Sequence, residues 1–243
     1  IFPCWQSKVA QMLNINCGVL TLSANCSGFQ LALSAADGLF HSDKKNSIIL
    51  LIGTAVQSSF INWNSPENSM YFGDGSGAIL LKRFEQKKYG IVAHETFTDP
   101  SAYEDVRLVG GGSNLPANLY SNKNKNNYLY DMSGIETWKQ VVTNQPRNIL
   151  NVLTKSKKTI KEINYFIFHQ ANKNLILFLA KKLDIPEKKI IFTVEKFGNT
   201  ADASVPITLD KLVKSKKLKK NDLILLSSVG AGFIYCSTIL KWA

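Results

Sequence analysis

The sequence of 243 residues contains no hydrophobic run long enough to cross a membrane. A transmembrane helix needs about 20 consecutive apolar residues, whereas the longest stretch here, Ile48 to Ile52 with its flank of small residues, has the length of a strand. The chain opens with IFPCWQSK, which has neither the charged segment nor the apolar core of a secretory signal. The opening therefore looks internal to a longer polypeptide, and the lack of a long apolar run predicts that the protein binds no membrane.

Cysteine and histidine are scarce, with four and three residues respectively. Cys4, Cys17, Cys26 and Cys236 show neither C-x-x-C pairs nor the Cys/His spacing of a zinc site. Four cysteines in a chain of this length do not make a disulfide scaffold. We therefore expect no metal, and reduced thiols in a cytoplasmic protein, most of them buried as small apolar side chains.

Acidic residues are fewer than basic ones, 18 against 29, which gives a formal net charge of +11. The lysines form doublets spread along the chain, a distribution typical of solvated surface. They are not interleaved with aromatic residues, and nothing resembles a recognition helix or a zinc finger. We expect no nucleic acid partner; the functional alternative to a solvated surface is a docking face for an acidic protein.

Strand-like and helix-like segments alternate along the chain, which predicts an α/β fold. The expected strands are 18–24, 47–54, 71–82 (opening with a GDGSGA turn), 90–97, 165–168, 189–193, 223–227 and 233–242, and the expected helices are 27–41, 135–153, 173–183 and 203–214.

The pattern of small-residue turn, helix, basic linker, strand, glycine turn and strand occurs twice, once from Cys26 and once from Asn199. Such self-similarity predicts two related halves packed as one unit. We expect 1–98 to belong to the first half, 99–160 to be a polar excursion followed by a helix, and 161–243 to complete the second half. Cys26 and Asn199 would then occupy equivalent corners that face a shared cleft.

Cys26 follows an apolar run, in SANCSGF, and begins a long amphipathic segment. A cysteine on the first turn of a helix faces unpaired backbone N–H groups, which favour the thiolate over the thiol. His169 in FIFHQAN and Asn199 in KFGNTADAS supply polar groups after other apolar segments. Together these residues predict acyl transfer on a cysteine.

Five motifs follow one another along the chain: ANCSGF, FGDGSGA, HQAN, GNT followed by ASVP, and GAGF. In order and spacing they resemble the ketoacyl synthase III family of the thiolase superfamily, over essentially the whole chain. The resemblance implies a thiolase-like fold of two pseudo-symmetric α/β halves, each with a mixed sheet packed against helices, and a homodimer. It also implies that the chain lacks the N-terminal part of full members, which would leave an open sheet edge and exposed apolar faces.

The family uses a Cys–His–Asn triad, which Cys26, His169 and Asn199 match. The resemblance implies condensation of an acyl-CoA with malonyl-acyl carrier protein, in fatty-acid or polyketide initiation, without a cofactor. Cys26 would attack the acyl thioester, and the backbone N–H groups of Cys26 and Ala231 would hold the oxyanion. His169 and Asn199 would stabilise the enolate that decarboxylation leaves.

Other positions carry over from the family as well. Phe2 aligns with an aromatic that crosses the dimer interface to the acyl pocket, and Met132 and Trp138 are further pocket candidates. All three are bulky, which favours short acyl groups. Lys139 and Lys173 fall where basic residues dock the acidic carrier protein.

The chain also departs from the family pattern. Asn174 replaces a common arginine, Ala231 replaces the middle glycine of a GGGF-like loop, and Phe197 and Asp202 differ from the usual HGNTSAAS. These changes indicate a diverged member. His41 and His94 lack such motifs and are expected to be structural or surface residues.

Two alternatives on the same scaffold remain. One is a non-elongating acyltransferase of secondary metabolism, and the other is a non-catalytic subunit that binds acyl carriers. Hydroxymethylglutaryl-CoA synthase would need a glutamate base that is not evident here, and plant-type polyketide synthases carry a GFGPG loop where this chain has SVGAGFIYCS.

Overall fold

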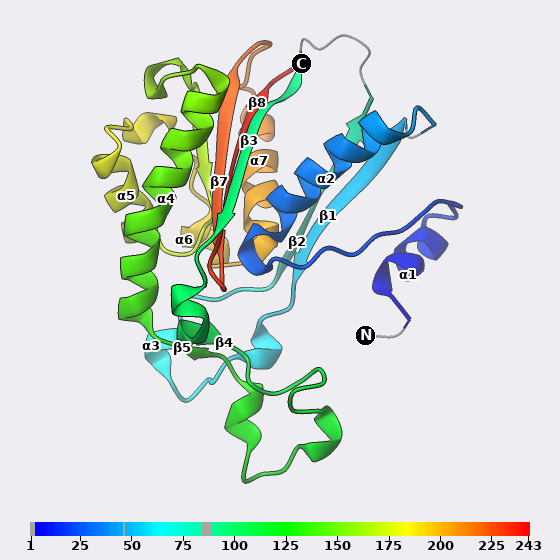
Figure 1. Ribbon diagram of the computed structural model, residues 1–243, viewed down its shortest axis with the longest axis vertical. Coiled ribbons are helices and arrows are strands. Elements are labelled where there is room, and N and C mark those ends of the chain that lie inside the picture. The colour runs from blue at the N-terminus through cyan, green and yellow to red at the C-terminus, as the bar shows by residue number, and fades with distance from the viewer. Residues whose placement is uncertain (1–2, 46, 84–88) are drawn as a thin grey trace.

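The computed structural model describes residues 3–45, 47–83 and 89–243. Its elements form layers in which helices lie between two sheets and outside the larger one (Figure 1). The helices are α1 (Trp5–Met12), α2 (Gly28–Ser42), α3 (Pro66–Ser69), α4 (Gly134–Ser156), α5 (Lys173–Lys182), α6 (Val194–Phe197) and α7 (Ser204–Lys214). The strands are β1 (Ile48–Ala55), β2 (Gly75–Lys82), β3 (Gly90–Thr98), β4 (Val106–Arg107), β5 (Asp131–Met132), β6 (Tyr165–Phe168), β7 (Leu223–Gly230) and β8 (Ile234–Lys241). No helix within these ranges has both the length and the apolarity needed to span a bilayer.

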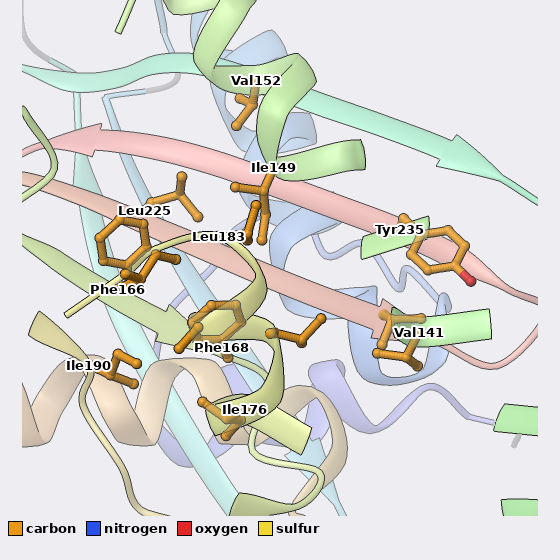
Figure 2. Close-up of a cluster of buried hydrophobic side chains, with 14 of the residues drawn as sticks. Val141, Ile149, Val152, Phe166, Phe168, Ile176, Leu183, Ile190, Leu225 and Tyr235 are labelled. Carbon is orange, nitrogen blue, oxygen red and sulfur yellow. The ribbon is translucent and has the colours of Figure 1, made fainter. Parts of the chain in front are cut away.

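The larger sheet has the order β3-β8-β7-β6, with β6 parallel to β7 and the other pairs antiparallel. Its side chains alternate between two cores, as the period of a strand requires. Phe166, Phe168 and Leu225 face α4 and α5, in the cluster that Figure 2 shows. Ile167 and Leu226 face α2 and α7 on the other side.

A second sheet pairs β1 with β2 in antiparallel register, and the short strands β4 and β5 form a separate antiparallel pair. Phe29 and Leu33 of α2 and Leu51 of β1 share one core with residues of α7, so α2 and α7 lie between the two sheets (Figure 1). Leu50 and Leu80, which face each other in this register, are 38% and 68% exposed.

Two predicted strands are wrong. Residues 18–24 are extended and mostly exposed, because no described strand lies beside them to complete a ladder. Residues 189–193 contribute one parallel bridge, from Ile190 to Phe166, before the chain turns into α6. The remaining predicted helices and strands are present, and β7 continues three residues further, to Gly230.

The predicted duplication is visible in the elements. A 3-10 turn leads into α2, which is followed by the antiparallel pair β1–β2; a second 3-10 turn leads into α7, which is followed by the antiparallel pair β7–β8. These turns are η1 (Asn25–Ser27) and η8 (Ala201–Ala203), and they pack against each other. The two halves therefore meet where Cys26 lies.

Candidate active site

Cys26 lies at the centre of η1, against the turn that joins β7 to β8. A Cβ placed on Gly230 would lie 3.2 Å from the backbone nitrogen of Cys26. The amide of Asn25 donates to the carbonyl of Ala231 over 2.9 Å, and the Ser27 hydroxyl donates to the carbonyl of Ile234 over 2.8 Å. Glycine at position 230 is thus required for this close approach between the first half and the turn.

The oxyanion hole expected from the sequence involves two backbone N–H groups in this region. Among the described residues, neither the N–H of Cys26 nor that of Ala231 donates a hydrogen bond. Backbone donors left unpaired at a turn are available to a ligand oxygen. Alanine in place of glycine at position 231 leaves its N–H available.

His169 lies at the carboxyl end of β6, where its N–H donates to the Ser227 carbonyl over 2.7 Å and extends the pairing with β7. The imidazole is only 6% exposed, and its Nδ1 lies 2.8 Å from the Ser204 hydroxyl at the start of α7. Burial lowers the pKa of His169 to about 4, against a weaker opposing effect of a backbone hydrogen bond with Ala201. His169 is therefore neutral at physiological pH.

Asn199 is buried beside the second 3-10 turn. Gly198 precedes it with φ +65° and ψ −159°, a conformation open essentially to glycine, and the N–H of Asn199 donates to the Tyr71 carbonyl over 2.7 Å. The side-chain oxygen accepts the N–H of Ala201 over 2.9 Å. This bond fixes the orientation of the amide, so its NH₂ group is the end presented to a ligand.

The segment around His169 is anchored by Gln170, whose side chain is fully buried. Its amide NH₂ donates to the carbonyls of Phe168 and Ile191, and its oxygen accepts the N–H groups of Thr193 and Val194. All the hydrogen-bonding capacity of this amide is thus used to hold the segment before α6 beside β6. The segment turns away after Ile190 for this reason.

The thiol of Cys26 is partly exposed at the surface but is surrounded by dense protein. Burial and the nearby carboxylate of Asp202 raise its pKa to about 12. The expectation that this cysteine rests as a thiolate is therefore wrong, because desolvation and a like charge outweigh the unpaired N–H groups of the turn. Cys26 and His169 are both neutral in the unliganded chain.

The prediction that Cys26 and Asn199 occupy equivalent corners of the two halves is wrong. Asn25 and Ala201 have φ of 48° and 47°, and each begins the 3-10 turn of its half. Cys26 and Asp202 are the next residues, so Asp202 and not Asn199 occupies the corner equivalent to that of Cys26. Asn199 lies two residues before the turn and reaches the site through its own Asx bond to Ala201.

The other cysteines differ from expectation in one respect. All four thiols are free, but Cys4 and Cys17 are exposed and only Cys236 is buried. Cys4 precedes α1, a helix without buried residues, and Cys17 lies on the exposed extended segment. The expectation that most cysteines are buried is wrong because this part of the chain contributes little to either core.

Comparisons with known proteins match this architecture. The sequence model described as 3-Oxoacyl-[acyl-carrier-protein (ACP)] synthase III matches residues 20–100, and that of its C-terminal domain matches residues 153–242. The beta-ketoacyl-[acyl-carrier-protein] synthase III of Rickettsia rickettsii is 33% identical over 242 residues, which cover 99% of this chain and 73% of the relative. The chain belongs to the 3-oxoacyl-[acyl-carrier-protein] synthase III family.

Solved structures of the synthase III family have the same fold. The enzyme from Aquifex aeolicus superposes with a TM-score of 0.87 at 32% identity, covering 99% of this chain and 73% of that chain. The enzyme from Thermus thermophilus gives 0.90 at 27% identity, covering 100% and 74%. A priming beta-ketosynthase from the R1128 polyketide pathway gives 0.89 at 26% identity, covering 99% and 70%. The predicted thiolase-like α/β fold is confirmed.

The synthase III pocket residues predicted from the sequence are not all brought together. Phe2 lies outside the described residues. Met132, in β5, is two residues from Tyr130, whose phenol is close enough to Cys26 for the two groups to interact electrostatically. Trp138 instead packs against Phe178 of α5, with ring centroids 5.7 Å apart, and no described contact links it to Cys26.

The two predicted docking lysines lie on α4 and α5. Lys139 pairs with Glu136 over 2.7 Å and is 64% exposed. Lys173 pairs with Glu195 over 2.5 Å and stacks over the Phe192 ring at 5.6 Å. Both ammonium groups are accessible, and both already have a local acidic partner.

Ser204 and Gln170 hold His169 and the segment beside it, and neither is among the site residues predicted from the sequence. Each stands within or beside a recognised synthase III motif, Ser204 in ASVP and Gln170 in HQAN, so the signal was present. Asp74, in the GDGSGA turn, accepts the N–H and hydroxyl of Ser58 over 2.9 and 2.6 Å. It acts as a turn residue, as expected.

Proposed function

We propose that this protein forms an acyl-cysteine from an acyl-CoA and condenses it with malonyl-acyl carrier protein in a decarboxylative Claisen reaction. The observation that carries the proposal is that η1, which holds Cys26, packs against η8, whose first residue, Ala201, is hydrogen-bonded to both Asn199 and His169. Family membership gives the substrate classes, because the relatives are named as beta-ketoacyl-[acyl-carrier-protein] synthases. The product is a 3-oxoacyl thioester that starts a fatty-acid or polyketide chain.

The first step loads the enzyme. The sulfur of Cys26 attacks the thioester carbonyl carbon of the acyl-CoA, the carbon–sulfur bond to CoA breaks, and the Cys26 proton leaves with CoA as its thiol. The oxyanion formed in between accepts the free N–H groups of Cys26 and Ala231. Two backbone donors of this kind stabilise developing charge without having to reorganise.

The second step consumes the acyl group. Malonyl thioester loses CO₂, and the electron pair left behind forms an enolate whose oxygen accepts hydrogen bonds from Asn199 and His169. The enolate carbon attacks the acyl carbonyl of Cys26, and the sulfur leaves and takes up one proton. The reaction uses no metal or redox cofactor, since the oxyanion and the enolate each accept hydrogen bonds from backbone or side-chain donors.

The hydrogen bonds around His169 suit this role. Ser204 Oγ accepts the N–H of Gln170 over 3.3 Å, so its own hydroxyl proton is available to Nδ1 of His169. The proton of the neutral ring then lies on Nε2 and can be donated. The low pKa of His169 favours a neutral donor that does not have to lose a proton first.

The acidic carrier would dock on the basic face that includes Lys139 and Lys173. Charge complementarity of this kind accelerates encounter and fixes orientation more than it adds affinity. Each lysine would exchange its local glutamate for an acidic group of the carrier. We also propose that the enzyme works in the cytoplasm as a homodimer, in which Phe2 and Met132 shape a pocket for short primers.

Release of CO₂ separates this function from its alternatives. The chain would be incubated with acetyl-CoA and malonyl-acyl carrier protein labelled in the malonyl carboxylate, and the labelled CO₂ would be counted. Condensation predicts one CO₂ for each 3-oxoacyl product, with Asn199→Ala reducing both by at least about tenfold because an enolate donor is lost. Acyl transfer to another acceptor without CO₂ would indicate the non-elongating acyltransferase, and neither reaction would indicate the non-catalytic subunit.

A further inference from the structure

Asp202 occupies the position in the second half that the nucleophile occupies in the first. Both residues are second in a three-residue 3-10 turn, both follow a residue with φ near +48°, and both are two residues before a long helix. The hydrogen bonds repeat as well: Ser27 N–H donates to the Ala24 carbonyl over 3.0 Å, and Ala203 N–H donates to the Thr200 carbonyl over 3.1 Å. Asp202 is therefore the pseudo-symmetric mate of Cys26.

The carboxylate of Asp202 points across the contact between the two turns. A Cβ placed on Gly28, the first residue of α2, would lie 3.5 Å from Oδ2 of Asp202 and 3.7 Å from its Cβ. Gly28 is two residues from Cys26, so the carboxylate lies beside the base of the helix that the nucleophile precedes. Alanine stands at the matching position of the usual HGNTSAAS motif, which makes this charge a property of the present chain.

Of the titratable groups around Cys26, Asp202 is the one whose charge changes near neutral pH. Burial raises the pKa of Asp202 to about 6, against opposing hydrogen bonds from the backbone of Ala203, Thr54 and Asp202 itself. The pKa of Tyr130, near β5, is raised to about 12, and that of His169, after β6, is lowered to about 4. Cys236 on β8 has a raised pKa, so it is also neutral. The faces of α2 and β7 that pack on η1 add no titratable side chain.

We propose that Asp202 is a positioning residue that acts through the nucleophile: its carboxylate adds to the effect of burial in disfavouring the thiolate of Cys26 in the resting enzyme, so that Cys26 becomes reactive only as its proton is taken up during thioester exchange. This role of Asp202 rests on the proposed function, in which Cys26 is the nucleophile. A thiolate at a partly exposed position reacts with many electrophiles. The carboxylate limits such side reactions, and the oxyanion donors then favour attack on a bound thioester.

The test is the pH profile of alkylation of Cys26 by iodoacetamide, a neutral reagent, in the folded chain. Peptide mass spectrometry would follow Cys26 and the exposed Cys17 separately, so Cys17 is an internal control. The variants are Asp202→Asn, of the same shape, and Asp202→Ala, with the usual family residue. Asp210→Asn is the matched control, since it removes the same charge from an exposed position on α7.

In the wild-type chain we expect Cys26 to react more slowly than Cys17 at pH 8, with a rate still rising at pH 10. Removing a like charge beside a thiol lowers its pKa by about 1 unit or more, so Cys26 in both Asp202 variants should react roughly tenfold faster at pH 8. Cys17 and the Asp210→Asn chain should be unchanged. Unaltered or slower Cys26 rates in a folded Asp202 variant would overturn the proposal.

The wild-type profile keeps the test decisive if a variant does not fold. A midpoint for Cys26 at or below that of Cys17 would contradict a restraining carboxylate without any substitution. Alkylation needs no acyl-CoA, so the two proposals fail separately. Faster alkylation in the variants without acyl-enzyme formation would support Asp202 and refute condensation, whereas acyl-enzyme formation with unaltered alkylation would refute the role of Asp202 alone.

Discussion

At the scale of single residues, the site combines a thiol and an imidazole that are both uncharged. Burial lowers the pKa of His169 to about 4 and helps raise that of Cys26 to about 12. The sequence predicted a site of Cys26, His169 and Asn199 because their motifs have specific neighbours. The protonation states of Cys26 and His169 were not predictable from the sequence. Both depend on the density of surrounding protein, and that of Cys26 depends also on Asp202, which lies 176 positions further along the chain.

The stability of the chain should reveal the neutral state of His169. Its pKa in the folded chain lies below the usual 6.5, so the stability it allows is present above pH 6.5 and is lost as the pH falls towards 4. Urea unfolding of wild type and His169→Gln at pH 7 and pH 4.5 measures this. We expect the free energy of unfolding of wild type to fall by about 2–3 kcal/mol relative to the variant over that interval.

The titration of Asp202 changes the free energy of unfolding in the opposite direction, so its effect has to be distinguished from that of His169. Its folded pKa is raised, so its contribution favours folding at low pH and is lost as the pH rises through about 6. The slope is the same in wild type and in His169→Gln and cancels in the difference. A difference between the two chains that did not change from pH 7 to pH 4.5 would contradict a buried neutral His169.

At the scale of elements, the hydrophobic pattern predicted the helices and the long strands because each buries at least one face in a core. It was wrong for residues 18–24 and 189–193, which have apolar composition but lack a continuous strand partner. Composition cannot say whether a ladder partner is present. It also cannot show that Gln170 captures the N–H groups of Thr193 and Val194 and turns the chain into α6.

The turn that positions Asn199 depends on Gly198. A Cβ at this position would lie 2.8 Å from the Tyr71 carbonyl oxygen, in a backbone conformation that other residues rarely adopt. Gly198→Ala should therefore destabilise the chain by about 1–3 kcal/mol and lower condensation activity in the chains that remain folded. Chemical denaturation followed by circular dichroism measures the first effect.

Gly38→Ala is the matched control for this substitution. Gly38 lies within α2, and no atom would lie within 4 Å of an added Cβ. Alanine there should stabilise the helix by roughly 0.5–1 kcal/mol, since glycine loses more backbone entropy on folding. Equal stability changes for the two variants would show that the Asn199 turn is not conformationally restricted.

At the scale of the whole molecule, the site exists because two similar halves meet at their 3-10 turns. The duplication visible in the sequence correctly predicted that the halves converge near Cys26. The sequence pattern paired Cys26 with Asn199 because each stands in the small-residue turn that opens its copy of the repeat, whereas the backbone pairs Cys26 with Asp202. A shift of this size cannot be found from motif positions, since it depends on where each turn begins.

The most direct measurement of the central claim is the intact mass of the folded chain after mixing with a panel of acyl-CoAs. Cys26→Ala is the test variant, and Cys17→Ala is its control, because Cys17 is an exposed thiol outside the site. We predict a gain of one acyl group in the wild type and in Cys17→Ala, and none in Cys26→Ala. No adduct with any acyl-CoA, or an adduct that persists in Cys26→Ala, would contradict Cys26 as the nucleophile.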